Sequence, residues 1–115
     1  MTRQPTTISK RQAFLQAGKK GSRTTTKAMV ILLHDRGDSL PPRFGYTASR
    51  RIGGAVLRNR AKRRMRAIAR DFLLNQAPAG HDIVLIARQP CITMGFAEMA
   101  SQASSRLQHL AGKTA

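Results

Sequence analysis

The chain has 115 residues, a length that fits one domain with one modest hydrophobic core. We expect one domain over residues 1–115, with a flexible tail at 1–7 and the folded part at 8–112. A hydrophobic content of 41% argues against disorder throughout. The charge is unusual, because 21 Lys and Arg residues against five Asp and Glu give a formal net charge of +16. Such self-repulsion destabilises a compact fold unless a counter-charge is bound, and nucleic acid is the expected partner.

Several other classes of protein are disfavoured. A single cysteine, Cys91, excludes an intrachain disulfide and a Cys-based zinc site. His34, His81 and His109 lack the i, i+4 spacing of helical metal ligands, so we expect no metal bound by the protein. No apolar run approaches the roughly 18 residues of a membrane span, and the N-terminus has no hydrophobic signal core. We therefore expect a cytoplasmic protein without a membrane partner.

The first predicted element is a short helix. Ser9 is its candidate N-cap, and Gln12 at the third helical position completes a capping box. Phe14 and Leu15 give the helix a small apolar face, and we expect it to reach about Ala17 before the basic and glycine residues that follow end it.

Four later segments have the pattern of β-strands. The polar, β-branched residues 22–26 indicate an edge strand, and the apolar run 27–34 indicates a buried one. Apolar and polar side chains alternate over 43–49, which is typical of a strand with one face on the core. We expect 27–34 and 43–49 to form an antiparallel hairpin. A second apolar run, 81–88, indicates a central strand.

Two further helices are predicted, at about 55–76 and about 95–111. At about 100° per residue, the apolar side chains of the longer helix fall within an arc of about 80°, and cations cover most of the remaining circumference. The element order α-β-β-β-α-β-α predicts an α+β fold, a two-layer sandwich with a small mixed sheet. The expected buried stripe of the longer helix is Leu57, Ala61, Met65, Ile68 and Phe72, extended by Ala69 and Leu73. The expected buried stripe of the last helix is Phe96, Met99, Ala103, Leu107 and Leu110.

The stretch 50–70 dominates the sequence, because nine of its 21 residues are Arg or Lys and none is Asp or Glu. Helix faces that only contact solvent normally carry acidic residues among the basic ones. The absence of acids here therefore argues against a helix face that is merely solvated and binds no partner. A membrane-binding role would need the apolar stripe that the core already requires. A nucleic-acid-binding helix fits the charge density and the preference for Arg, which contacts phosphate in a bidentate manner. Composition leaves RNA and DNA open.

The order of residues within this stretch resembles a known family. Residues 53–66 (GlyGlyAlaValLeuArgAsnArgAlaLysArgArgMetArg) resemble the ArgAsnArg signature of the bacterial ribonuclease P protein subunit. Residues 44–51 resemble the strand that precedes that motif, 80–88 resemble the family's last strand, and 107–110 its terminal helix. Phe14 fits the aromatic residue of the family's first helix. The resemblance covers about residues 8–112.

Three residues depart from the family pattern. Gly54 replaces the usual Asn of a Gly-Asn turn, and Gly18 replaces a second aromatic residue on the first helix of some members. Leu32 replaces a stacking aromatic residue on the first long strand. The family binds the 5′ leader of precursor tRNA, and stacking of an aromatic side chain contributes about 1–3 kcal/mol per base. Leader binding is therefore expected to depend here more on Phe14 and on charge than on further stacking residues.

The resemblance implies a fold similar to ribosomal protein S5 domain 2, with a left-handed β-α-β crossover in place of the usual right-handed form. It also implies a subunit, one protein per RNA, that joins the catalytic RNA of ribonuclease P, an endoribonuclease that removes the 5′ leader of precursor tRNA. Five scattered acids do not form the carboxylate cluster that holds catalytic metal in protein nucleases. The chemistry is therefore expected to lie in the RNA and its Mg²⁺, with no catalytic residue in the protein.

Two binding surfaces follow from the resemblance. If the chain is not a ribonuclease P subunit, the alternative function is that of a structural ribosomal RNA-binding protein. A DNA-binding protein is less favoured, because no helix-turn-helix is evident. The residues expected to bind the catalytic RNA are Arg58, Asn59, Arg60, Lys62, Arg63 and Arg66. Those expected in a leader-binding cleft between the first helix and the sheet are Phe14, Val30, Leu32, Thr47, Ser49, Arg50 and Arg51.

Overall fold

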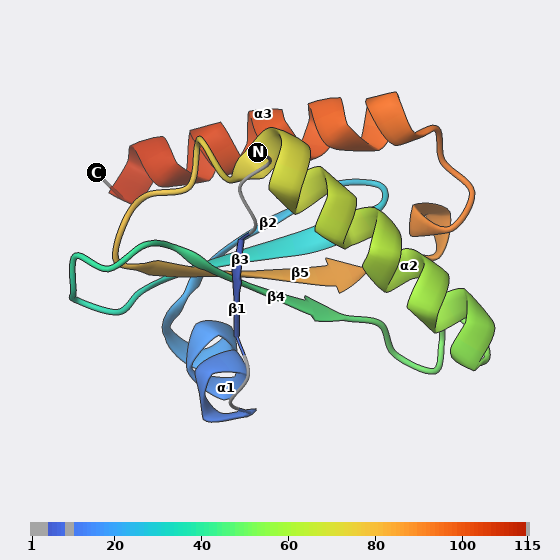
Figure 1. Ribbon diagram of the computed structural model, residues 1–115, viewed down its shortest axis with the longest axis horizontal. Helices are drawn as coiled ribbons and strands as arrows, with labels where there is room; N and C mark the ends of the chain where they lie inside the picture. The colour runs from blue at the N-terminus through green and yellow to red at the C-terminus, as the bar shows by residue number, and fades with distance from the viewer. Residues whose placement is uncertain (1–4, 9–10, 115) are drawn as a thin grey trace.

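The computed structural model, which describes residues 5–8 and 11–114, is built around a mixed five-stranded sheet (Figure 1). The strand order is β1-β4-β5-β3-β2. β3 runs antiparallel to both β2 and β5, whereas β4 runs parallel to both β1 and β5. The strands are β1 (Thr6–Thr7), β2 (Ser22–Thr25), β3 (Met29–Asp35), β4 (Arg43–Thr47) and β5 (His81–Ala87).

Helices lie on both faces of this sheet. α2 and α3 cover one face and α1 lies against the other (Figure 1). The predicted α+β fold with a small mixed sheet is confirmed, and α1 adds a partial third layer to the expected two. The helices are α1 (Arg11–Lys20), α2 (Ala55–Ile68), a π-helical turn η1 (Ala69–Leu73) that continues α2, a 3₁₀ turn η2 (Gln89–Cys91) and α3 (Phe96–Thr114).

The predicted hairpin between 27–34 and 43–49 is wrong, because β5 lies between β3 and β4. Most residues of β5 are buried, and a strand with apolar side chains on both faces is most stable in the middle of a sheet. Since β4 and β5 are parallel, α2 serves as the crossover that parallel pairing requires. The left-handed form of this crossover stays a prediction.

The N-terminal segment also differs from the expectation of a tail over residues 1–7. Thr6 and Thr7 form β1, paired in parallel with Arg43 and Phe44 of β4, and the backbone N–H of Ile8 donates to the carbonyl of Phe44 at 2.8 Å. These residues therefore belong to the sheet. The N-cap predicted at Ser9 lies outside the described residues.

Side chains alternate between the two faces, so the sheet has two cores. In β3, Ile31 and Leu33 pack under α2 and α3, whereas Leu32 packs with Ala17 of α1. Gly45 of β4 also faces α1, and a Cβ at this position would lie 2.6 Å from the ring of Phe14. The absence of a side chain at Gly45 thus lets the Phe14 ring rest directly on the strand.

The buried stripe predicted for the long helix is largely confirmed, with Ala61, Met65 and Ile68 buried. Leu57 and Phe72, however, are 39% and 42% exposed. Leu57 lies in the first turn of α2. Phe72 lies in the π turn, where the Leu74 N–H bonds the Ala69 carbonyl, and the wider turn changes the helical phase on which the prediction relied. The Phe72 ring instead contacts Phe96 of α3, itself 36% exposed, at 6.0 Å between centroids.

One buried carboxylate ties the central strands to the loop that follows β3. Asp82 of β5 accepts hydrogen bonds from Arg43 at 2.8 Å and from Arg36 at 2.8 Å, and its side chain is almost completely buried. Burial raises the pKa of Asp82, but the hydrogen bonds from Arg43 and Arg36 outweigh it and hold the pKa below its usual range. A carboxyl group with a lowered native pKa stabilises the fold above its unfolded pKa of about 3.9 and loses this contribution as pH falls.

We predict that Asp82→Asn lowers the free energy of unfolding at pH 7 by about 3 kcal/mol, because Arg43 loses its counter-charge and Arg36 keeps only its more exposed partner Asp38. Urea unfolding followed by circular dichroism measures the change. The matched control is Asp71→Asn, which breaks the exposed Arg70–Asp71 pair and should matter far less. The difference between wild type and Asp82→Asn should shrink as the pH falls below about 4. Equal losses in the two variants would contradict the assigned role of Asp82.

Candidate nucleic-acid interface

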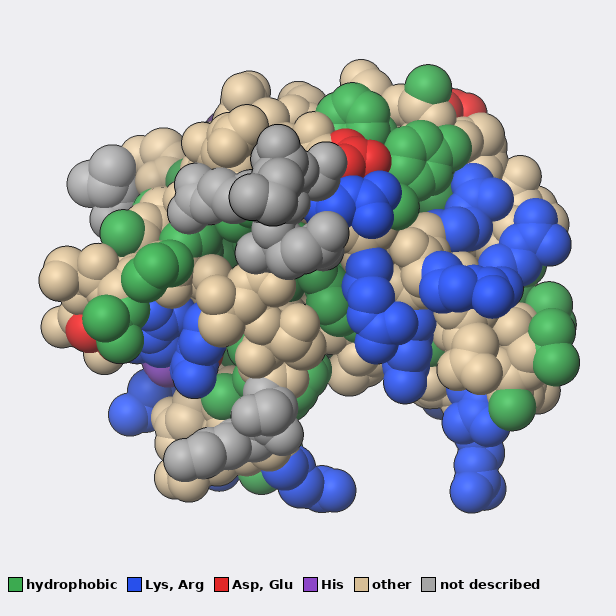
Figure 2. Space-filling model, viewed as in Figure 1, with side chains coloured by type: hydrophobic (Ala, Val, Ile, Leu, Met, Phe, Trp, Pro, Cys, Tyr) green, Lys and Arg blue, Asp and Glu red, His purple; other side chains and the backbone are tan. Residues whose placement is uncertain are grey.

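α2 presents the first predicted surface. Packing of its apolar stripe on the sheet directs the opposite side of the helix to solvent, and Figure 2 shows Lys and Arg side chains gathered over this helix. Of the six predicted residues, four are exposed and two are half-buried, and all lie outside the buried stripe. The exposed residues are Asn59, Arg60, Arg63 and Arg66, and the half-buried ones are Arg58 and Lys62.

This cationic surface has no acidic partners within the described part of the chain. The carboxylates that form ion pairs, Asp38, Asp82 and Asp71, pair with Arg36, Arg43 and Arg70. None of the six predicted residues takes part in a salt bridge there. Their positive field is therefore not cancelled locally, and it adds to the positive end of the α2 dipole near Gly54.

Arg66 is oriented by an aromatic ring. Its guanidinium carbon lies 5.4 Å from the centroid of the Tyr46 ring, a cation–π contact. Burial raises the pKa of Tyr46 to about 12, partly offset by the positive charge of Arg66, so the ring stays neutral at physiological pH. Arg66 is thereby held on the side of α2 nearest β4.

Arg64 has a different role from its neighbours on the helix. Its guanidinium donates hydrogen bonds to the backbone carbonyls of Ile92 and Met94 in the segment before α3. This side chain joins α2 to that segment and is only partly exposed. Sequence patterns alone place Arg64 among identical basic residues, and only the tertiary contact distinguishes it.

The second predicted surface lies on the α1 side of the sheet. The strand register places Val30, Ile86 and Thr47 side by side in one row across β3, β5 and β4. Phe14 is half-buried against Gly45, next to this row. Leu32 and Val30 are only 6% and 8% exposed, within the small core under α1, so they form the floor of this surface and offer little contact area.

The remaining predicted residues, Ser49, Arg50 and Arg51, lie in the turn between β4 and α2 and are exposed. This turn is held by its own hydrogen bonds, from Ile52 N–H to the Ser49 carbonyl at 3.0 Å and from Gly53 N–H to the Arg50 carbonyl at 3.1 Å. Because the turn leads directly into α2, it connects the two predicted surfaces.

Arg88 is a basic residue at this end of the sheet that the sequence did not single out as a site. It follows β5 immediately and lines a pocket together with Ser49 and Arg51. Gln89 fixes this neighbourhood by donating to the Arg51 carbonyl at 2.6 Å. Parallel pairing places the carboxyl ends of β4 and β5 together, and no sequence signal showed that these two strands are neighbours.

Metal-binding clusters and membrane-spanning helices are both absent from residues 5–8 and 11–114. There, no group of three or more His, Cys, Asp or Glu side chains is placed to hold a metal ion. No helix within the same residues is long and apolar enough to cross a membrane. Cys91 is buried, and burial raises the pKa of its thiol.

Comparison with known proteins identifies relatives of this arrangement. The chain matches the Ribonuclease P family over residues 2–111. It is 38% identical over 102 residues to the ribonuclease P protein component of Erythrobacter litoralis, covering 89% of this chain and 83% of that one. The Caulobacter vibrioides protein component is 41% identical over 105 residues, covering 90% of this chain and 70% of the relative.

Solved structures of the same kind share the fold. The RNase P protein from Thermotoga maritima superposes with a TM-score of 0.76 at 27% identity, over 90% of this chain and 96% of that chain. The Staphylococcus aureus RNase P protein superposes with a TM-score of 0.68 at 28% identity, over 93% of each chain. Together with the cationic α2 and its ArgAsnArg sequence, these matches establish that the chain belongs to the ribonuclease P protein family.

Proposed function

We propose that the chain is the protein subunit of ribonuclease P, that it binds the catalytic RNA through α2, and that it binds the 5′ leader of precursor tRNA through the α1 side of its sheet. The observation that carries this proposal is the acid-free cationic side of α2, exposed on a fold that the family shares. Seven of the 14 residues of α2 are Arg, Lys or Asn, and Arg58-Asn59-Arg60 stands at its first turns.

The contact with the catalytic RNA is mainly a contact with phosphates. Arg side chains match phosphate geometry in a bidentate manner, and each neutralised phosphate releases condensed counterions. Arg60 and Arg63 are exposed and without ion pairs among the described residues, so little desolvation or competition opposes binding. Neutralising RNA phosphates in this way would lower the Mg²⁺ concentration that the RNA needs to fold and act.

The leader contact combines one aromatic ring with cations at the sheet end. We call the set Phe14, Val30, Leu32, Thr47, Ser49, Arg50 and Arg51 the leader surface. The Phe14 ring contacts Gly45 and remains partly exposed, and we assign its exposed part to stacking on a base of the leader. Arg50 and Arg51 are exposed and would meet the phosphates on either side of that base.

The proposal assigns the cleavage step to the RNA partner and its Mg²⁺. Phosphodiester cleavage by a protein needs clustered carboxylates that hold metal, or positioned histidines that transfer protons. In this chain Asp82 and Asp38 accept hydrogen bonds from Arg36, and Asp71 is paired with Arg70. The protein then contributes binding, orientation and charge neutralisation.

The function is tested by reconstitution with a bacterial ribonuclease P RNA at low Mg²⁺ and a precursor tRNA. We expect the protein to stimulate release of the 5′ leader, measured by gel electrophoresis of labelled precursor. RNA binding without stimulation at any Mg²⁺ concentration would instead favour a structural ribosomal RNA-binding protein.

We predict that Arg60→Ala weakens assembly with the catalytic RNA by about 1.5 kcal/mol, because one charge-assisted phosphate contact is lost. The slope of log K against log salt concentration should fall in magnitude by about 0.9, and filter binding over a salt series measures both. The matched control is Arg70→Ala on the same long helix, whose charge is already paired with Asp71. Full assembly and activity of Arg60→Ala at low Mg²⁺ would count against α2 as the RNA-binding element.

We predict that Phe14→Ala weakens binding of leader-bearing precursor by about 1–3 kcal/mol and leaves binding of mature tRNA unchanged, because one stacking ring is lost. Binding of both tRNAs to the reconstituted holoenzyme measures the difference.

Two controls separate stacking from packing at this position. Phe14→Leu fills the space over Gly45 without an aromatic face, so it should keep the stability of wild type but not its leader affinity. Leu15→Ala changes the neighbouring exposed residue of α1 and should alter neither. Equal loss for precursor and mature tRNA would remove Phe14 from the leader surface.

A further inference from the structure

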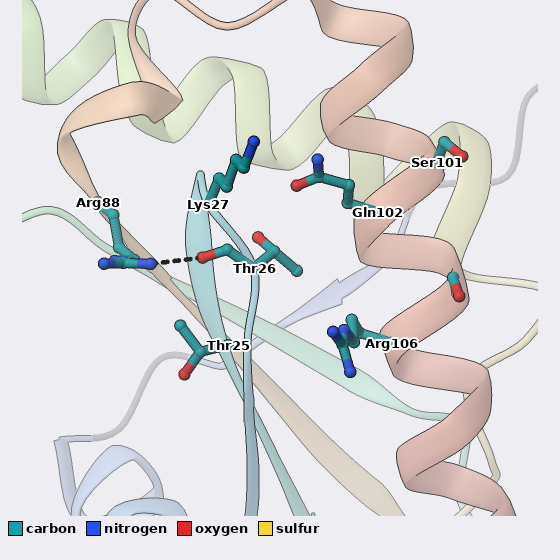
Figure 3. A pocket seen from close by; sticks show the side chains of 8 residues that line it. Thr25, Thr26, Lys27, Arg88, Ser101, Gln102 and Arg106 are labelled. Carbon is teal, nitrogen blue, oxygen red and sulfur yellow. Dashed lines mark hydrogen bonds between the residues drawn. The ribbon is translucent and has the colours of Figure 1, made fainter.

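A second basic pocket lies at the end of the sheet that carries the leader surface. It has a volume of about 610 Å³ and lies between the turn that joins β2 to β3 and the middle of α3 (Figure 3). This volume is within the range of ligand-binding pockets. The pocket is lined by Thr25, Thr26, Lys27, Arg88, Ser101, Gln102, Ser105 and Arg106.

The lining has the chemistry of an anion site. Lys27, Arg88 and Arg106 contribute three positive charges, the other lining residues are hydroxyl or amide side chains, and no carboxylate lines the pocket. Lys27 and Arg106 are exposed, and neither forms a salt bridge among the residues that the structure describes. Figure 3 shows them on opposite sides of the pocket, one on the turn and one on α3.

The turn that carries Lys27 is rigid. The buried Thr26 hydroxyl donates to the Met29 carbonyl at 3.1 Å and accepts from the N–H groups of Ala28 at 3.2 Å and Met29 at 3.1 Å. Arg88 holds the same turn from the other side by donating to the Thr26 carbonyl at 2.7 Å. The pocket wall is therefore preorganised, which reduces the entropy lost on binding a ligand.

Arg88 connects this pocket to the leader surface, because it also lines the pocket formed with Ser49 and Arg51. Because the spatial strand order is β4-β5-β3-β2, the segments at this end of the four strands lie side by side in that order. A continuous basic path thus runs from Arg51 past Arg88 to Lys27 and then to Arg106 on α3. A path of this kind suits a chain of phosphates better than a single small anion.

We infer that the pocket between the β2–β3 turn and α3 binds backbone phosphates of single-stranded RNA that continues past Arg88 from the leader surface. Lys27 and Arg106 are the cations specific to this pocket, while Ser101, Gln102 and Ser105 supply neutral hydrogen-bonding groups. The inference rests on the proposed function. It extends the leader site to nucleotides further from the cleavage point than those at Phe14.

The test uses the reconstituted holoenzyme and a series of precursor tRNAs whose leaders are lengthened one nucleotide at a time. With wild-type protein, affinity should rise with leader length until the pocket is filled. The double variant Lys27→Ala/Arg106→Ala should keep the gain from the first nucleotides and lose the gain from the last ones. For the longest leader, the slope of log K against log salt concentration should fall in magnitude by about 1.4, since single strands contribute about 0.7 per phosphate.

Lys20→Ala is the matched control. Lys20 is an exposed cation at the end of α1, just before β2 begins, whereas Lys27 follows the other end of β2. The Lys20→Ala variant should show the length dependence of wild type. A competition experiment with ADP and with inorganic pyrophosphate distinguishes a site for RNA phosphates from a site for free nucleotides. If the pocket binds free nucleotides, these compounds should displace the long leader from wild type but not from the double variant.

The outcomes separate the two proposals. If wild type does not bind leader-bearing precursor more tightly than mature tRNA, the proposed function fails. If wild type does so but the double variant keeps the full length dependence, only the inference about the pocket is overturned. An equal loss at every leader length, a loss of assembly with the catalytic RNA, or selective displacement by ADP or pyrophosphate would also overturn it.

Discussion

The position of β5 in the sheet is the constraint on which the rest of the structure depends. Parallel pairing with β4 on one side and antiparallel pairing with β3 on the other brings three chain segments to one sheet end. These are the turn before α2, the segment after β5 and the β2–β3 turn. Because the crossover from β4 to β5 must pass over the sheet, α2 is held with its apolar stripe inward and its cations outward.

Electrostatics explains how so basic a chain can be compact. Asp82 pairs with both Arg36 and Arg43 at the other end of the central strands, and Asp38 also pairs with Arg36, so two carboxylates balance two guanidinium groups that would be costly to bury alone. Most of the remaining cations are exposed, and those of α2 have no acidic partners within the described ranges. The charge that is left facing solvent is thus concentrated where a polyanion can bind, and RNA binding would relieve the repulsion.

The sequence predicted most elements and the α2 surface, because each depends on local periodicity. Ala61, Met65 and Ile68 recur at helical spacing, and the alternation over 43–49 placed Gly45 and Thr47 on one side of a strand. The failures have specific causes. The hairpin was inferred from neighbouring strands in the chain, but pairing depends on which strand is buried on both faces. The exposure of Phe72 follows from a π turn that helical periodicity cannot anticipate.

The sequence by itself determined the charge, the two-sided character of the long helix and, through Arg58-Asn59-Arg60, the family to which the chain belongs. These properties lie within single segments, so the order of residues is sufficient to specify them. Only the tertiary structure decided which cations act together. Arg64 is tied to the backbone near α3, Arg88 joins two pockets, and Lys27 faces Arg106 across 79 positions of the chain. Such groupings depend on strand order and register, which arise from long-range packing and leave no local signal in the sequence.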